Sequence, residues 1–198
     1  MNNIEALLLG ILQGATEFLP VSSSGHLQIA AKLFKIEEAD LSFTVILHLA
    51  TVLSTITVFR EEILLLIKNS LKINTDEFRY ILNIIISMIP VGIVGLFFKD
   101  YVEQLFEQNM IVVGVCLIIT SILLALTMII KNNNNNLSYS KSFIIGISQA
   151  IAVLPGLSRS GATISTGLLL GIKKSEVTKF SFLMVLLPVL GEGVLDIS

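Results

Sequence analysis

Two polar stretches interrupt an otherwise apolar chain. The first, QGATEFLPVSSSGH at residues 13–26, lies inside the apolar run Ile4–Ala31, and the second, PGLSRSGAT at residues 155–163, lies inside Ser142–Ile172. Clusters of Pro, Gly and Ser break a helix. Within the membrane such a break is tolerated only where the backbone is buried in protein or lines a water-filled cavity. The sequence therefore predicts two re-entrant hairpins, each made of two half-helices joined at a polar tip. The alternative is two helix–loop–helix pairs that lie at the membrane surface.

The composition indicates an integral membrane protein. Of 198 residues, 54% are hydrophobic and 14% are charged, with a net charge of −2 and one Cys. Nucleic-acid binding is not expected, because phosphate contacts need a cationic surface. Four further apolar runs are long enough, or nearly so, for ordinary spans; they are residues 41–59, 80–98, 110–130 and 180–195. The predicted fold is an all-α polytopic membrane protein with a single membrane domain over residues 1–198.

The distribution of Lys and Arg predicts an orientation in the membrane. Nine of the thirteen lie in the segments 60–79, 131–141 and 172–179, whereas three lie in the alternate segments and Arg159 lies in the second hairpin. Because cytoplasmic loops are rich in positive charge, the first three segments are expected on the cytoplasmic side. The first hairpin then enters from outside and the second from the cytoplasm.

The two broken stretches resemble each other at an offset of 136 residues. The pairs that match include Gly10 with Gly146, Gln13 with Gln149, Ser22 with Ser158, Ser24 with Ser160, and Gly25 with Gly161. Because the two hairpins are expected to enter the membrane from opposite sides, these matches predict an inverted-topology repeat. Its first half covers about residues 1–130, and its second half begins at about residue 142. Such repeats place a polar site where the hairpin tips meet. Counterparts of two spans are expected near 216–234 and 246–266, beyond Ser198, so either the second half is degenerate or the chain is truncated at its C-terminus.

The ionisable groups inside the broken stretches predict a phosphate site. Burial of an ionisable group at mid-membrane depth costs roughly 3 kcal/mol. Each such group is therefore expected either to form an ion pair or to take part in the function of the protein. Gln13 and Glu17 share one helix face and offer oxygen ligands to a divalent cation. His26 is expected to shuttle a proton or to attack phosphorus. The Ser- and Gly-rich turns are expected to bind phosphate through helix N-termini and the Arg fork; their residues are Ser22, Ser24, Gly25, Ser158, Arg159, Ser160 and Gly161. The simpler alternative is a structural Glu17–Arg159 ion pair.

These two motifs make the chain similar to the bacitracin-resistance family of undecaprenyl-diphosphatases. The resemblance implies hydrolysis of undecaprenyl diphosphate to undecaprenyl phosphate and inorganic phosphate, which recycles the lipid carrier for cell-wall synthesis. It implies a site in the bacterial inner (plasma) membrane that opens to the outer face, and a need for Mg²⁺ or Ca²⁺. It also implies that members continue tens of residues past position 198.

The resemblance also implies roles for individual residues. Catalytic roles fall on Glu17, Ser23, His26 and Arg159. Ser158 and Thr163 fall on supporting positions of the second motif, and both are expected to help bind phosphate. The family signature has Glu or Gln four residues before the essential Glu, and this chain carries the Gln variant, Gln13, which leaves one carboxylate fewer for the cation.

Several alternatives stay open at this point. Ser23 activated by His26 is the favoured nucleophile, and His26 itself or a water molecule are the others. A transporter or lipid flippase would share the inverted repeat, although it would not explain why acid, hydroxyl, imidazole and guanidinium groups converge. The oligomeric state is open, with a homodimer among the alternatives.

Overall fold

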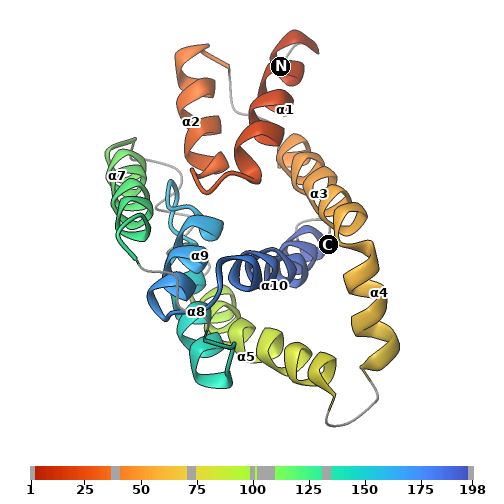
Figure 1. Cartoon of the computed structure of the whole chain (residues 1–198). Coiled ribbons are helices and arrows are strands. Elements are labelled where there is room, and N and C mark those ends of the chain that lie inside the picture. The colour runs from red at the N-terminus through yellow and green to blue at the C-terminus, as the bar shows by residue number, and fades with distance from the viewer. Residues whose placement is uncertain are drawn as a thin grey trace.

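The chain is all-helical over the residues that the computed structural model describes, which are 3–36, 41–70, 75–98, 101, 110–130 and 135–195. Residues 71–74 and 131–134, in two segments used to predict the orientation, lie outside these ranges. The helices are α1 (Asn3–Glu17), α2 (Ser23–Leu33), α3 (Leu41–Val58), α4 (Arg60–Asn69), α5 (Asp76–Phe97), α7 (Met110–Thr127), α8 (Tyr139–Ile151), α9 (Arg159–Leu169) and α10 (Lys174–Leu195) (Figure 1).

Both broken stretches form pairs of helices, as predicted. Helix α1 ends at Glu17 and α2 begins at Ser23, while α8 ends at Ile151 and α9 begins at Arg159. Each pair packs on itself, α1 against α2 and α8 against α9. The polar motifs therefore lie at the tips that join the paired helices.

The four predicted spans also form helices, namely α3, α5, α7 and α10. By length and composition, α5 and α7 are the described helices that are sufficient to cross a bilayer. The expectation of a loop throughout 60–79 is wrong, because residues 60–69 form α4. Acidic residues in its first turn, Glu61 and Glu62, and Lys68 in its last turn suit the helix dipole.

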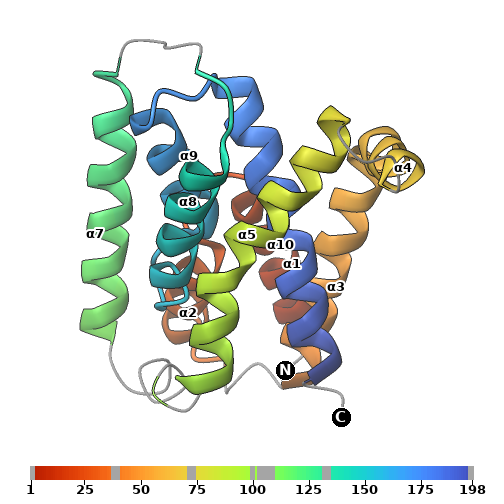
Figure 2. The ribbon, with the colours of Figure 1, turned by 90° about the horizontal axis from the view of Figure 1, so that it is seen from below.

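The long helices run alongside one another between two ends of the molecule (Figure 2). Helix α4 and the C-terminal end of α7 lie at one end, whereas the start of α1 and the end of α10 lie at the other.

The core lies between α5, α8, α9 and α10, where α8 and α10 each pack against α5 and against α9. Its members include Ile84, Ile145, Val177, Phe180 and Met184. Glycine permits the closest of these helix contacts: a Cβ at position 146 would lie 2.3 Å from the Ser87 carbonyl oxygen, and one at position 167 would lie 2.0 Å from Val177. One buried hydrogen bond, 2.7 Å from Ser142 Oγ to Asn83 Oδ1, joins α8 to α5.

Apolar side chains also cover outer faces of the helices. On α5, Ile85, Ile89 and Ile93 recur every fourth residue, and each is about half exposed. On α7, Ile111 and Ile118 are 75% and 62% exposed. Stripes of this kind mark surfaces that meet an apolar environment.

Candidate active site

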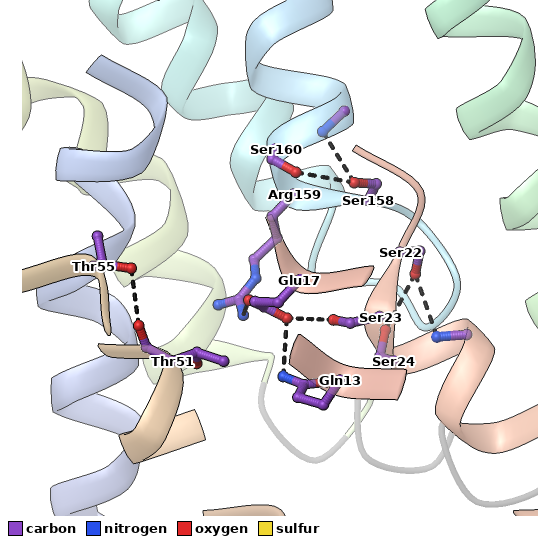
Figure 3. A network of polar contacts seen from close by, with 12 residues as sticks. Gln13, Glu17, Ser22, Ser23, Ser24, Thr51, Thr55, Ser158, Arg159 and Ser160 are labelled. Carbon is purple, nitrogen blue, oxygen red and sulfur yellow. Dashed lines mark hydrogen bonds and ion pairs between the residues drawn. The ribbon is translucent and has the colours of Figure 1, made fainter. Parts of the chain in front are cut away.

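Glu17 is the centre of the polar contacts in the first hairpin. Its Oε2 accepts a hydrogen bond from Gln13 Nε2 at 3.0 Å and a short one from Ser23 Oγ (Figure 3). Glu17 ends α1 and Ser23 begins α2, so the tight turn between them brings the carboxylate to the hydroxyl. Gln13 reaches the same carboxylate because it lies one helical turn before Glu17.

Both hairpin tips use the same helix cap. Ser22 is the N-cap of α2, and its Oγ accepts from Gly25 N at 3.3 Å; Ser158 is the N-cap of α9, and its Oγ accepts from Gly161 N at 3.0 Å. A second hydroxyl lies 3.3 Å from each cap oxygen, Ser24 Oγ in one tip and Ser160 Oγ in the other (Figure 3). Serine caps leave other first-turn N–H groups available, which suits an anion at the helix N-terminus.

Ser22 holds an unusual backbone conformation. Its φ of 68° lies in the left-handed region, whereas its counterpart Ser158 has a φ of −72°. A non-glycine residue in this region is strained, and the strain persists only where the surroundings enforce it.

The Ser22 carbonyl oxygen fixes the ring of His26. It lies 2.8 Å from His26 Nδ1, and because a carbonyl only accepts, Nδ1 is the nitrogen that carries hydrogen. His26 Nε2 is then the basic nitrogen of the neutral ring. The expected activation of Ser23 by His26 has no counterpart among the described hydrogen bonds, in which Ser23 Oγ donates to Glu17.

The two tips touch. A Cβ on Gly25 would lie 3.1 Å from Gly156 Cα, and one on Gly161 would lie 3.0 Å from the Pro20 carbonyl oxygen. Arg159 Nη2 extends from the second tip to within 3.8 Å of Glu17 Oε1, and both side chains are partly exposed. The contact thus assembles one site from residues about 140 positions apart.

Further contacts hold Arg159 and its helix in place. Thr163 is fully buried, donates to the Arg159 carbonyl oxygen at 2.8 Å, and lies 2.5 Å from Ser181 Oγ. Thr120 Oγ1 on α7 accepts from Ser158 N at 3.1 Å. The structure therefore places Thr163 behind the tip as a support, and it adds Thr120 and Ser181, which carry no motif in the sequence.

Two threonines of α3 lie near the site. Thr51 and Thr55 are buried, and Thr55 Oγ1 donates to the Thr51 carbonyl oxygen at 2.9 Å. Figure 3 shows both on the side of Arg159 that faces away from the serine turns. Their spacing of four residues on an apolar helix is a signal that could have identified them.

The oxygen atoms beside Glu17 suit a hydrated Mg²⁺ ion. Gln13 Oε1 is buried and has no hydrogen-bond partner among the described residues, so it is free to face a cation. The described residues contain no cluster of three or more His, Cys, Asp or Glu side chains. One carboxylate with amide oxygen suits Mg²⁺, which keeps water and takes phosphate oxygens, better than it suits an all-protein Ca²⁺ cage.

Over the residues that the structure describes, this is an all-helical protein in which two helix pairs meet and bring together an acid, a hydroxyl and a guanidinium. Residues 6–198 match the family model described as bacitracin resistance protein BacA, so the chain belongs to that family. The resemblance noted from the two motifs is confirmed.

Curated relatives are similar over almost the whole chain. The undecaprenyl-diphosphatase of Bacteroides thetaiotaomicron is 52% identical over 99% of this chain and 75% of its own length. That of Parabacteroides distasonis is 53% identical over 100% of this chain and 75% of its own length. A relative of the same name from Methanococcus vannielii is 43% identical over 98% of this chain and 79% of its own length.

Proposed function

We propose that this protein hydrolyses undecaprenyl diphosphate to undecaprenyl phosphate and inorganic phosphate, and so recycles the lipid carrier for cell-wall synthesis. Family membership and the names of the relatives support the activity. The observation that carries it is the arrangement around Glu17, whose carboxylate accepts from Ser23 while Arg159 of the other hairpin lies beside it. A hydroxyl, a base and a phosphate-binding guanidinium are the groups that phosphoryl transfer needs.

Ser23 is the nucleophile that this geometry favours. Its Oγ attacks the terminal phosphorus in line with the bridging oxygen, and its proton passes to Glu17 Oε2, which already accepts its hydrogen bond. The new Oγ–P bond replaces the bridging P–O bond, and undecaprenyl phosphate leaves. Water then hydrolyses the phosphoserine and releases inorganic phosphate.

Arg159 and the serine turns bind the phosphoryl oxygens. The planar guanidinium forms paired hydrogen bonds to such oxygens, and it is partly exposed at the tip. The first-turn N–H groups of α2 and α9 add the positive ends of two helix dipoles. Negative charge that develops in the transition state is therefore met from both hairpins.

His26 has its best-supported role in the second step. With hydrogen on Nδ1, its Nε2 is available to accept a proton from the attacking water. Attack by His26 itself, or by water in a single step, would leave Ser23 as a binding residue only.

Gln13 and Glu17 are the residues that would hold a divalent cation. When bound, the ion neutralises the charge of the diphosphate oxygens. Gln13 Oε1 is buried and has no hydrogen-bond partner among the described residues, which supports this assignment, and the single carboxylate favours Mg²⁺ over Ca²⁺.

The membrane arrangement belongs to the same proposal. We infer a multi-pass protein of the bacterial inner membrane, one domain in which two re-entrant hairpins of an inverted repeat meet, with the site open to the outer face. The exposed apolar stripes of α5 and α7 and the length of these helices support insertion in a bilayer.

Phosphate release by the purified protein in detergent tests the activity. Undecaprenyl diphosphate should yield inorganic phosphate in a Mg²⁺-dependent manner, and acid quench should trap a phosphoserine. Ser23→Ala should abolish both signals. A transporter would release no phosphate, and substantial turnover by Ser23→Ala would assign the attack to His26 or water.

A further inference from the structure

Helix α10 contacts both hairpins through two consecutive residues that the proposed mechanism does not use. Ser181 Oγ lies 2.5 Å from Thr163 Oγ1 on α9. The ring centroid of Phe182 lies 6.2 Å from that of Phe18 in the first hairpin. Because neighbouring side chains of an α-helix point about 100° apart, one turn of α10 presents a different face to each hairpin.

The hydroxyl contact connects Ser181 to the backbone of Arg159. Thr163 carries a single hydroxyl hydrogen, and its Oγ1 donates to the Arg159 carbonyl oxygen at 2.8 Å and, at a longer 3.3 Å, to that of Ser160. With this hydrogen already donated, Thr163 can only accept from Ser181, so Ser181 is the donor. Two hydrogen bonds in series therefore lead from α10 to the residue that carries the guanidinium.

Both hydroxyl groups are enclosed by protein. Thr163 is 0% exposed and Ser181 is 1% exposed, so water cannot replace a partner that is lost. Hydrogen bonds in series strengthen one another in such surroundings. The first turn of α9, which begins at Arg159, therefore depends on a hydroxyl of α10 for its position.

The aromatic contact connects α10 to the carboxylate of the first hairpin. Phe18 directly follows Glu17, the last residue of α1. Phe182 packs its ring on Phe18 and also on Phe59, at a centroid distance of 6.0 Å, where α3 meets α4. Ring pairs at these separations attract each other. The turn that carries Glu17 is thus held against the same helix as Arg159.

The direct contact between the two charged groups is weak by comparison. Arg159 Nη2 lies 3.8 Å from Glu17 Oε1, which is longer than a hydrogen bond, and both side chains are partly exposed. A partly exposed ion pair of this length contributes little to stability. The separation of the two groups therefore depends on the elements that hold each of them.

We propose that Ser181 and Phe182 are positioning residues, which hold the Arg159 guanidinium and the Glu17 carboxylate at the separation that the diphosphate requires. The inference rests on the proposed function, because it concerns groups assigned there. It gives α10, which the sequence predicts only as an ordinary span, a part in the site.

A double-variant cycle tests whether Ser181 acts through Arg159. In the purified full chain in detergent, Ser181→Ala should lower kcat/KM for undecaprenyl diphosphate on the order of tenfold, because a displaced binding group is costly. Arg159→Lys has already lost the planar fork, so in that background Ser181→Ala should cost less than about threefold. Ser181→Cys retains a weak donor and should lie between wild type and Ser181→Ala.

Phe182→Leu tests the contact with the first hairpin. The variant keeps an apolar side chain but removes both ring pairs. We expect kcat/KM to fall roughly three- to tenfold, with little change in melting temperature.

Ser142→Ala is the matched control for Ser181→Ala. Ser142 is likewise buried, and it donates to Asn83 Oδ1 at 2.7 Å near the start of α8, whereas the tip follows the end of that helix. Loss of either hydroxyl should lower the melting temperature by a similar amount. Ser142→Ala should nevertheless keep kcat/KM within about twofold of wild type in both backgrounds.

Three results would overturn the inference. They are wild-type kcat/KM in Ser181→Ala or in Phe182→Leu, equal losses from Ser181→Ala in the two backgrounds, and failure of both Ser181 variants to fold, which would assign Ser181 to the core. Affinity for inorganic pyrophosphate, measured by isothermal titration calorimetry, gives the same cycle without turnover. A coupling of Ser181 to Arg159 in pyrophosphate affinity, in a protein that releases no phosphate, would support the inference and contradict the proposed function.

Discussion

At the scale of single residues, Arg159 decides whether the contact between the hairpins is a binding site or a scaffold. Its guanidinium lies 3.8 Å from Glu17 and is partly exposed, so it is available to a ligand. Lys retains the positive charge but not the planar fork. We expect Arg159→Lys to lower phosphate release on the order of 10²-fold, with little change in melting temperature.

A matched pair of variants separates the two roles. If Arg159 only neutralised Glu17, Arg159→Lys would stay active, and Glu17→Gln combined with Arg159→Gln would melt higher than either single variant. That outcome follows because the double variant leaves no unpaired charge.

The strained cap of α2 gives a second prediction at this scale. Ser22→Gly relieves a left-handed backbone, worth about 1–2 kcal/mol, and loses a cap worth a few tenths. Ser158→Gly loses the same cap without relief, because its φ is −72°. Thermal melts in detergent should therefore show Ser22→Gly more stable than wild type and Ser158→Gly less stable; the same direction in both would show that Ser22 is not strained.

At the scale of helices, the close contact of α8 with α5 depends on Gly146. A Cβ there would lie 2.3 Å from backbone of Ser87, so the helices must separate. We expect Gly146→Ala to cost about 1–3 kcal/mol and to lower the melting temperature by several degrees. Gly14→Ala is the control, because nothing lies within 4 Å of a Cβ at that position and alanine favours a helix. Equal changes in melting temperature for the two variants would mean that α5 and α8 can separate without cost.

The sequence predicts most of the helices but not all of their contacts. Breaks at Pro, Gly and Ser mark the hairpin tips directly, because these residues end helices in any surroundings. Helix α4 was not predicted, because the Lys and Arg residues of its segment were assigned to a loop. The partner of Ser23 depends on the backbone path between Glu17 and Ser22, including the positive φ of Ser22, which residue spacing does not specify.

At the scale of the whole molecule, the proposed orientation places Lys68 and Lys32 on opposite sides of the membrane. Lys68 is exposed on α4 and Lys32 is exposed on α2. We expect Lys32→Cys to react with a membrane-impermeant maleimide in intact cells, and Lys68→Cys to react only after permeabilisation. The native Cys116 is 4% exposed and should give little background. Labelling of Lys68→Cys in intact cells would show that the protein has the opposite orientation.

The paired tips also have a consequence for the symmetry of the site. At the offset of 136, Ser23 corresponds to Arg159, so the proposed nucleophile and the proposed phosphate ligand occupy the same structural position in the two hairpins. Two identical subunits would have to carry the same residue at both places. A single polypeptide is free of that constraint, so its two hairpins can carry different residues at this position. The two positions can therefore have different functions, which a symmetric assembly of identical chains would not allow.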